Sequence, residues 1–157
     1  MRTITSIQAP GTKRPVGHYS QAIVHGGLVF VSGQLPADLE TGVVKGGSIE
    51  SQTERTLANV ARVLEAAGSG LDRLIQVTIY VSDIAHWPIV NATYARILGA
   101  HRPSRAIVPV APLHSGAEIE IQAIGMVRPR RRAAPRTKAP RKAGRRRAPR
   151  RAARGRS

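Results

Sequence analysis

The sequence contains no cysteine, and its aromatic residues are limited to one Trp, three Tyr and one Phe among 157 positions. The absence of cysteine excludes disulfide scaffolds, thiolate zinc sites and thiol nucleophiles. So few aromatic side chains argue against a stacking platform for single-stranded nucleic acid. No apolar run approaches the roughly 20 residues of a membrane span, and the N-terminal segment lacks the apolar stretch of a secretory signal. We therefore expect a cytoplasmic protein with no membrane partner.

Acidic residues are absent from the C-terminal thirty positions, although the chain as a whole has 25 Lys or Arg, 9 Asp or Glu and a formal charge of +16. Residues 1–127 hold ten of the basic residues and all nine acidic ones, so this part is near +1 (10 − 9). Residues 128–157 hold the other fifteen basic residues (25 − 10) and consist almost wholly of Arg, Lys, Ala, Pro and Gly. Such a segment has too few apolar groups to offset the entropy cost of ordering. The sequence predicts one domain over residues 1–127 and a disordered basic tail over residues 128–157.

Four segments of the domain have the hydrophobic pattern of β-strands. Two of them alternate between apolar and polar residues, which predicts strands with one buried face. A third is a continuous apolar run that we expect to be covered on both faces. A fourth contains Pro109, which restricts it to a sheet edge or a bend. The alternating segments are Leu74–Asp83, with Ile75, Val77, Ile79 and Val81 on one face, and Ala117–Val127; the continuous run is Gly26–Gln34, and the fourth segment is Ala106–Ala111.

Two further segments have helical periodicity. Ser48–Gly68 is predicted to be a helix that Gly68 ends, and a second helix is predicted after Asp83, which we expect to cap it. Their apolar stripes are Ile49, Thr53, Leu57, Val60 and Leu64 in the first, and Trp87, Val90, Tyr94, Ile97 and Leu98 in the second. The order of elements predicts an α+β domain, a mixed sheet with both helices on one face. The other face is apolar in several strands, so we expect another subunit to cover it.

The polar residues that suggest chemistry are few. The five histidines are scattered without metal-ligand spacing, so no metal site is predicted. The glycine pairs match neither a phosphate-binding loop nor a dinucleotide fingerprint. Arg105 lies at the mouth of a short apolar strand, where a guanidinium requires a partner; a ligand carboxylate and a strand glutamate both remain open. Glu118 and Glu120 are expected side by side on one strand face. Burial between subunits would raise a carboxyl pKa there and fit it to act on water, whereas a solvated face would not.

Several short motifs together resemble the reactive intermediate deaminase family (RidA, also called YjgF). Their order and spacing extend over about 110 residues, so the resemblance covers almost all of residues 1–127 and none of the tail. The motifs are GHYSQAI at 17–23, VFVSGQLP at 29–36, the helix at 52–68, VNATY at 90–94, HRPSRAIVPVAPL at 101–113 and GAEIEIQAI at 116–124.

The resemblance implies a chorismate-mutase-like fold and a homotrimer with three clefts between adjacent subunits. It further implies hydrolysis of reactive enamines and imines, such as 2-aminoacrylate, to a 2-keto acid and ammonia without a metal or organic cofactor. In this family pattern Arg105 grips the substrate carboxylate and Glu120 positions the attacking water. The pattern also implies a backbone carbonyl at Ile107 that receives the substrate nitrogen, and cleft-lining residues at Tyr19, Ser32, Gly33 and Asn91.

The sequence departs from the family pattern at two positions near the implied cleft. Ile107 stands where many members have cysteine, and His114 stands where the family often has proline in an LPxG turn. The first change is expected to alter packing and substrate fit more than activity, because the implied role belongs to the backbone. The second is expected to change the loop beside the cleft.

Two other functions remain open from the sequence. The fifteen cations of residues 128–157 suggest a polyanion partner, so the protein could instead be a nucleic-acid-associated trimer that binds DNA or RNA through its tail. Against this, an Arg/Ala/Pro/Gly extension is also what a GC-rich gene encodes when a frameshift or the loss of a stop codon extends its reading frame. A trimer that binds small carboxylates without turnover is the other alternative.

Overall fold

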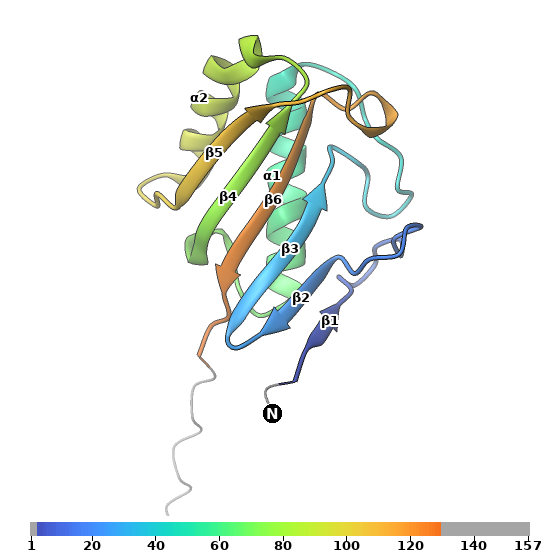
Figure 1. Ribbon diagram of the computed structural model, residues 1–157, viewed down its shortest axis with the longest axis vertical. Helices are drawn as coiled ribbons and strands as arrows, with labels where there is room; N and C mark the ends of the chain where they lie inside the picture. The colour runs from blue at the N-terminus through green and yellow to red at the C-terminus, as the bar shows by residue number, and fades with distance from the viewer. Residues whose placement is uncertain (1–2, 130–157) are drawn as a thin grey trace, which may run out of the picture.

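The computed structural model describes residues 3–129, and the predicted tail residues 130–157 lie outside this range. A six-stranded mixed sheet forms one layer and two helices pack on one of its faces (Figure 1). The strand order is β1-β2-β3-β6-β4-β5, in which only β4 and β5 are parallel. The expectation of an α+β domain with both helices on one sheet face is confirmed. The elements are β1 (Thr5–Ile7), β2 (Ala22–His25), β3 (Leu28–Gln34), α1 (Ile49–Ala66), β4 (Leu74–Val81), α2 (Trp87–Leu98), β5 (Ser104–Pro109) and β6 (Ile119–Met126).

A two-residue turn joins β2 to β3. Gly26 and Gly27 have φ angles of 62° and 85°, and positive φ at both positions is what a type I′ hairpin turn requires. The apolar run predicted as a strand from Gly26 therefore begins two residues later. The prediction that both faces are covered is wrong within one chain, because Val29 and Val31 are buried while Phe30 is 40% exposed. Helices cover only one face of this sheet, so alternate side chains of β3 remain open.

Helix α1 forms as its sequence predicts. Ser48 caps it by accepting a 3.2 Å hydrogen bond from the Ser51 amide, and Gly68 follows its end with a φ of 74°. All five residues of the predicted stripe are buried against the sheet. Leu57, Val60 and Leu64 have no exposed surface and lie at the centre of the core.

Strand β4 differs from its predicted alternation at one end. Its pairing with β6 shifts register between Leu74 and Gln76, and this bulge buries Leu74 while leaving Ile75 41% exposed. Ile75 is therefore not on the buried face with Val77, Ile79 and Val81, as the simple alternation required.

The second helix begins later than predicted. Asp83 accepts a 2.8 Å hydrogen bond from the Ala85 amide and caps a 3-10 turn at Ile84–His86, so it is not the cap of α2 itself. Trp87 is the first residue of α2 and is 45% exposed, which removes it from the predicted buried stripe. Val90, Tyr94 and Leu98 are buried as expected. Because the 3-10 turn precedes α2, the residues at the start of this helix face a different direction from the one that the sequence alone suggested.

The last two strands, β5 and β6, complete the sheet. β5 is an edge strand, as Pro109 predicts, and β6 buries Ile119, Ile121 and Ala123 beneath the helices. The chain stays attached to the domain just beyond β6, where the Arg128 guanidinium donates a 2.7 Å hydrogen bond to the Asp72 carboxylate. Residues 3–129 contain no helix of the length and apolarity that a membrane span needs.

Candidate active site

The site begins at an irregularity in β3. The pairing of β3 with β6 is interrupted between Val31 and Gln34, the interval that holds Ser32 and Gly33. The Ser32 hydroxyl donates a 2.7 Å hydrogen bond to the Ser20 carbonyl, and the Ser32 amide donates to the Gln21 carbonyl at 3.0 Å. These bonds attach the segment before β2 to the interrupted part of β3. The interruption thus opens space over the neighbouring strand β6.

Glu120 on β6 fills part of that space. A Cβ atom added at Gly33 would overlap the Glu120 Oε1 atom and would lie 2.8 Å from its carboxyl carbon. No side chain larger than that of glycine fits at position 33 while Glu120 keeps this conformation. The VSGQ segment therefore sets where the carboxylate lies.

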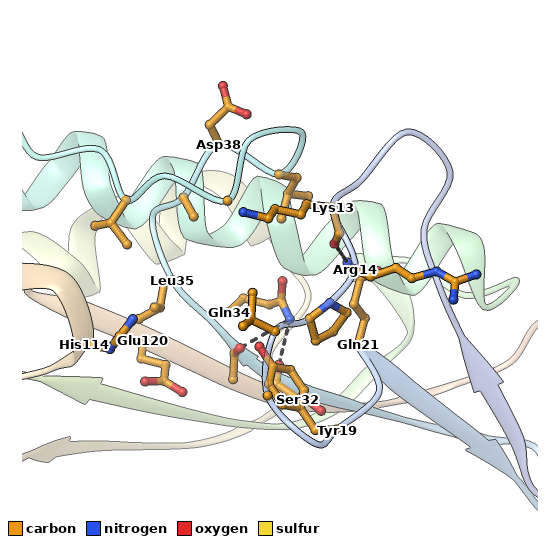
Figure 2. A pocket seen from close by; sticks show the side chains of 18 of the residues that line it. Lys13, Arg14, Tyr19, Gln21, Ser32, Gln34, Leu35, Asp38, His114 and Glu120 are labelled. Carbon is orange, nitrogen blue, oxygen red and sulfur yellow. Dashed lines mark hydrogen bonds between the residues drawn. The ribbon is translucent and has the colours of Figure 1, made fainter.

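The Glu120 carboxylate borders a pocket of about 870 Å³ on the sheet face opposite the helices. Tyr19, Ser32, Gly33 and His114 also line this pocket, here called the Glu120 pocket. Figure 2 shows the His114 ring beside Glu120 at one end, with Tyr19 and Ser32 farther along. Burial raises the pKa of Glu120, and the charge of His114 opposes that rise.

Glu118 does not belong to this pocket. It lies just before β6, and its carboxylate accepts a 2.9 Å hydrogen bond from Gln52 Nε2 of α1 and lies 3.4 Å from His86 Nε2. The expectation that Glu118 and Glu120 stand side by side on one strand face is therefore wrong. The strand begins only after Glu118, so its side chain does not follow the alternation of β6.

Arg105 on β5 is held by two residues of α2. Its guanidinium donates a 2.7 Å hydrogen bond to the Asn91 Oδ1 atom and lies 4.6 Å from the centre of the Tyr94 ring. The Tyr94 hydroxyl is buried without a hydrogen-bond partner among residues 3–129. Burial raises the pKa of this phenol to about 12, although the Arg105 charge acts in the opposite direction. The ring and the amide fix the guanidinium plane.

No carboxylate of the described chain forms an ion pair with Arg105; the salt bridges found there involve His86, Arg96 and Arg128. The strand-glutamate partner that the sequence left open is therefore not used. Arg105 instead borders a second pocket of about 510 Å³ together with Asn91 and Tyr94. Its charge is available to an anion from outside the chain.

Arg105 and Glu120 lie on opposite faces of the sheet. Arg105 pairs with Val77, and Val77 pairs with Ala123 in β6; both partners are buried beneath the helices. Glu120 pairs with Tyr80 on the other face. The structure thus brings Tyr19, Ser32, Gly33 and Glu120 together in one pocket and Asn91 and Arg105 in the other. Ile107 lines neither pocket and packs against the core.

Sequence reasoning missed two features of the candidate site. It assigned Tyr94 only to the apolar stripe, although Asn91 and Tyr94 stand three residues apart and so share a helix face that meets Arg105. It also treated His114 only as a departure in a turn, and the placement of His114 at the Glu120 pocket has no local sequence signal. Within residues 3–129 no group of three His, Asp or Glu side chains has the arrangement of a metal site.

Comparison with known proteins agrees with this architecture. The family model described as "Endoribonuclease L-PSP" matches residues 8–127. A RutC family protein of Pyrococcus horikoshii is 41% identical over 111 residues, which cover 71% of this chain and 88% of the relative. The human protein named 2-iminobutanoate/2-iminopropanoate deaminase is 31% identical over 128 residues, covering 82% and 91%.

A solved structure with the same fold is a putative endoribonuclease L-PSP from Entamoeba histolytica. It matches with a TM-score of 0.75 and 37% identity over 80% of this chain and the whole of that chain. The sequence matches and this structural match together confirm the resemblance and the fold that it implied. The chain therefore belongs to the reactive intermediate deaminase (RidA) family, whose family model is described as endoribonuclease L-PSP.

Proposed function

We propose that this protein hydrolyses small 2-imino acids, such as the imine tautomer of 2-aminoacrylate, to 2-keto acids and ammonia. The observation that carries the proposal is the Arg105 guanidinium, which Asn91 and Tyr94 fix in place and which has no carboxylate partner within residues 3–129. A guanidinium held in this way matches the carboxylate that all 2-imino acids share. The name of the human relative, 2-iminobutanoate/2-iminopropanoate deaminase, supports the same substrate class.

The chemistry needs one further group, which Glu120 supplies. Its raised pKa brings the carboxyl closer to neutrality, where a general base is most effective. Water attacks C2 of the imine, the C2–O bond forms and the electrons of the C=N double bond move to nitrogen. Glu120 accepts a proton from the water and passes it to that nitrogen. The hydroxyl proton follows by the same route as the C–N bond breaks, which leaves the keto acid and ammonia.

We further propose that the working site lies between subunits of a homotrimer. Arg105 and Glu120 occupy opposite sheet faces in one chain, so one small substrate cannot reach both within a subunit. The face that carries Glu120 also leaves Phe30 and Met126 40% and 44% exposed, which favours burial against another copy. In this arrangement Arg105 of one subunit and Glu120 of the next act on the same molecule.

The first experiment measures release of keto acid from 2-aminoacrylate generated in situ. Wild-type protein is expected to accelerate it, and Arg105→Ala to lower kcat/KM roughly 10- to 150-fold, the value of a charge-assisted hydrogen bond of about 1.5–3 kcal/mol. Arg96→Ala is the matched control, because Arg96 is bound to Glu50 and Glu54 outside both pockets. Equal rates for Arg105→Ala and wild type would remove Arg105 from the mechanism. If the wild-type protein does not accelerate release of keto acid, the remaining function is binding of small carboxylates without turnover.

Subunit mixing tests the shared site. Arg105→Ala and Glu120→Gln proteins are each expected to be weakly active alone. When equal amounts are unfolded and refolded together, random trimers contain one intact Arg105–Glu120 pair in every mixed ring, which restores about a quarter of wild-type activity. No recovery, with mixed trimers demonstrated by mass, would show that the site is not shared in this way.

A second proposal concerns residues 128–157, supported by their fifteen basic and no acidic side chains. We propose that they bind nucleic acid through phosphates, without reading sequence. Because Arg128 is bound to the domain, the informative truncation ends at residue 129. Full-length protein should bind DNA and RNA more tightly than this truncation at physiological salt, with a steep decrease as salt rises. Equal binding by the two proteins would exclude the role.

A further inference from the structure

His114 stands in a turn that holds it at the Glu120 pocket. The 3-10 turn at His114–Gly116 lies between β5 and β6, and Ser115 within it has a φ of 56°, the one positive value among the non-glycine residues of the described chain. Its next residue, Gly116, has a φ of 72°. The turn closes through a 3.3 Å hydrogen bond from the Ala117 amide to the His114 carbonyl. This backbone shape directs the His114 ring toward the carboxylate end of the pocket (Figure 2).

Within the described chain, burial and the His114 charge are the two influences on the ionisation of Glu120, and no hydrogen bond to the carboxylate contributes. In the proposed trimer, Arg105 of the next subunit would bring a second cation to this site. His114 acts from beyond ion-pair distance, since their atoms form no salt bridge in the described chain.

Three of the remaining titratable groups near the pocket have hydrogen-bond partners elsewhere. On β4, the hydroxyl of Tyr80 donates a 3.2 Å hydrogen bond to Gln122. In the segment before β2, Lys13 Nζ donates to the Thr41 carbonyl at 3.3 Å. The Asp38 carboxylate accepts from the amides of Glu40 and Thr41, and it points away from the pocket in Figure 2. The other ionisable residues at the pocket are Arg14 and Tyr19, both with exposed side chains.

We propose that His114 is a positioning residue that keeps Glu120 ionised by placing an imidazolium charge across the pocket from the carboxylate. A half-buried carboxylate is destabilised by loss of water, and a protonated Glu120 cannot accept a proton from the attacking water. A cation opposite the carboxylate offsets that loss. His114 exchanges no proton with the substrate in this role.

The direct test follows Glu120 itself, without substrate. The side-chain carboxyl carbon of Glu120, labelled with ¹³C, is titrated by NMR in the full-length wild type and in His114→Gln. The midpoint of the titration is expected to move to higher pH in the variant, because the opposing positive charge is lost. His25→Gln is the matched control, since His25 is exposed at the end of β2 and lines neither pocket. An unchanged midpoint in His114→Gln, or a move to lower pH, would overturn the proposal.

A second variant distinguishes loss of the charge from a change in the shape of the turn. His114→Lys keeps a cation at all relevant pH values, so its Glu120 midpoint should lie below that of His114→Gln. If both variants shift the midpoint upward equally, the cause is the shape of the turn and the charge role is refuted.

The kinetic consequence rests on the proposed function. In the deaminase assay, the acid limb of the kcat/KM profile should move to higher pH in His114→Gln, and the difference from wild type should narrow as pH rises. His114→Lys should restore the position of the limb. If wild type shows no deaminase activity, the proposed function fails, and the carboxyl titration still decides the role of His114.

Discussion

Replacement of Gly33 by alanine tests how closely β3 sets the position of the Glu120 carboxylate. Gly33 has no positive φ, so alanine fits the backbone there without strain. The added methyl group meets only the flexible end of Glu120, since its three nearest heavy atoms are Oε1, Cδ and Cγ of that side chain. The substitution therefore moves a functional group while leaving the core intact.

The size of the effect follows from the distances. The new Cβ would lie 2.8 Å from the carboxyl carbon and 3.2 Å from Cγ, against about 3.4 Å for an ordinary contact, and it would overlap Oε1. The carboxylate must rotate away by about 1 Å or more, and a misplacement of about 1 Å lowers a rate on the order of 100-fold. Stability should change little or rise by about 0.4–1 kcal/mol, because alanine restricts the unfolded chain.

The assay is imine hydrolysis, measured as kcat/KM and paired with thermal unfolding of the same samples. Gly46→Ala is the matched control, because Gly46 has open space around its Cβ position and an ordinary φ. In the Glu120→Gln background, Gly33→Ala should have almost no further effect on kcat/KM, since the group it displaces has already lost its function. Wild-type activity in Gly33→Ala, or a loss of activity matched by a large loss of stability, would refute this reasoning.

Three other predictions concern stability and pH. Tyr94→Phe removes a buried hydroxyl without a partner among the described residues and keeps the ring under Arg105, so the unfolding free energy should stay equal or rise by up to about 1 kcal/mol, with activity retained. Gln52→Ala should cost about 1–3 kcal/mol in denaturant unfolding, because Gln52 is 3% exposed and its side-chain amide bonds both the amide and the carboxylate of Glu118. Because the pKa of Glu120 is raised in the folded protein, the wild type loses stability as pH rises from the ordinary value of 4.5 through that raised pKa. Glu120→Gln should therefore melt higher than wild type at pH 7, and the two curves should converge below pH 4.5. The first prediction is contradicted if Tyr94→Phe unfolds at a lower temperature than wild type. The second is contradicted if Gln52→Ala has the unfolding free energy of wild type, and the third if the melting temperatures of Glu120→Gln and wild type run parallel across the pH range.

Much of the fold could be predicted because its elements carry regular periods. Helix α1 and strand β6 repeat apolar residues at the spacing of their geometry, and the structure buries those residues. The bulge in β4 could not be predicted, because Leu74 and Ile75 are both apolar and an extra residue in a strand changes register without changing composition. The 3-10 turn before Trp87 escaped prediction for a similar reason, since Asp83 is an equally good cap for either kind of turn.

Part of the candidate site could be predicted from local patterns. The alternation of the last strand indicated Glu118 and Glu120 together, and only the resemblance to the family selected Glu120. The short apolar strand indicated that Arg105 needs a partner but not which one. The error at Glu118 arose because alternation was extended past the true start of β6. The division of Arg105 and Glu120 between two sheet faces depends on the pairing of β5, β4 and β6, which is a long-range property.

The direction of β6 also determines how the chain can be engineered. Glu120 is near the start of this strand and Arg128 follows its end, so at about 3.3 Å per residue the polypeptide leaves the sheet some 25 Å from the carboxylate. None of residues 126–129 lines the Glu120 pocket or the Arg105 pocket. A fusion or truncation at residue 129 thus acts at the end of the sheet remote from Glu120. An affinity tag or reporter domain placed there should leave the proposed imine hydrolysis intact, while replacement of the basic segment should remove the proposed polyanion binding.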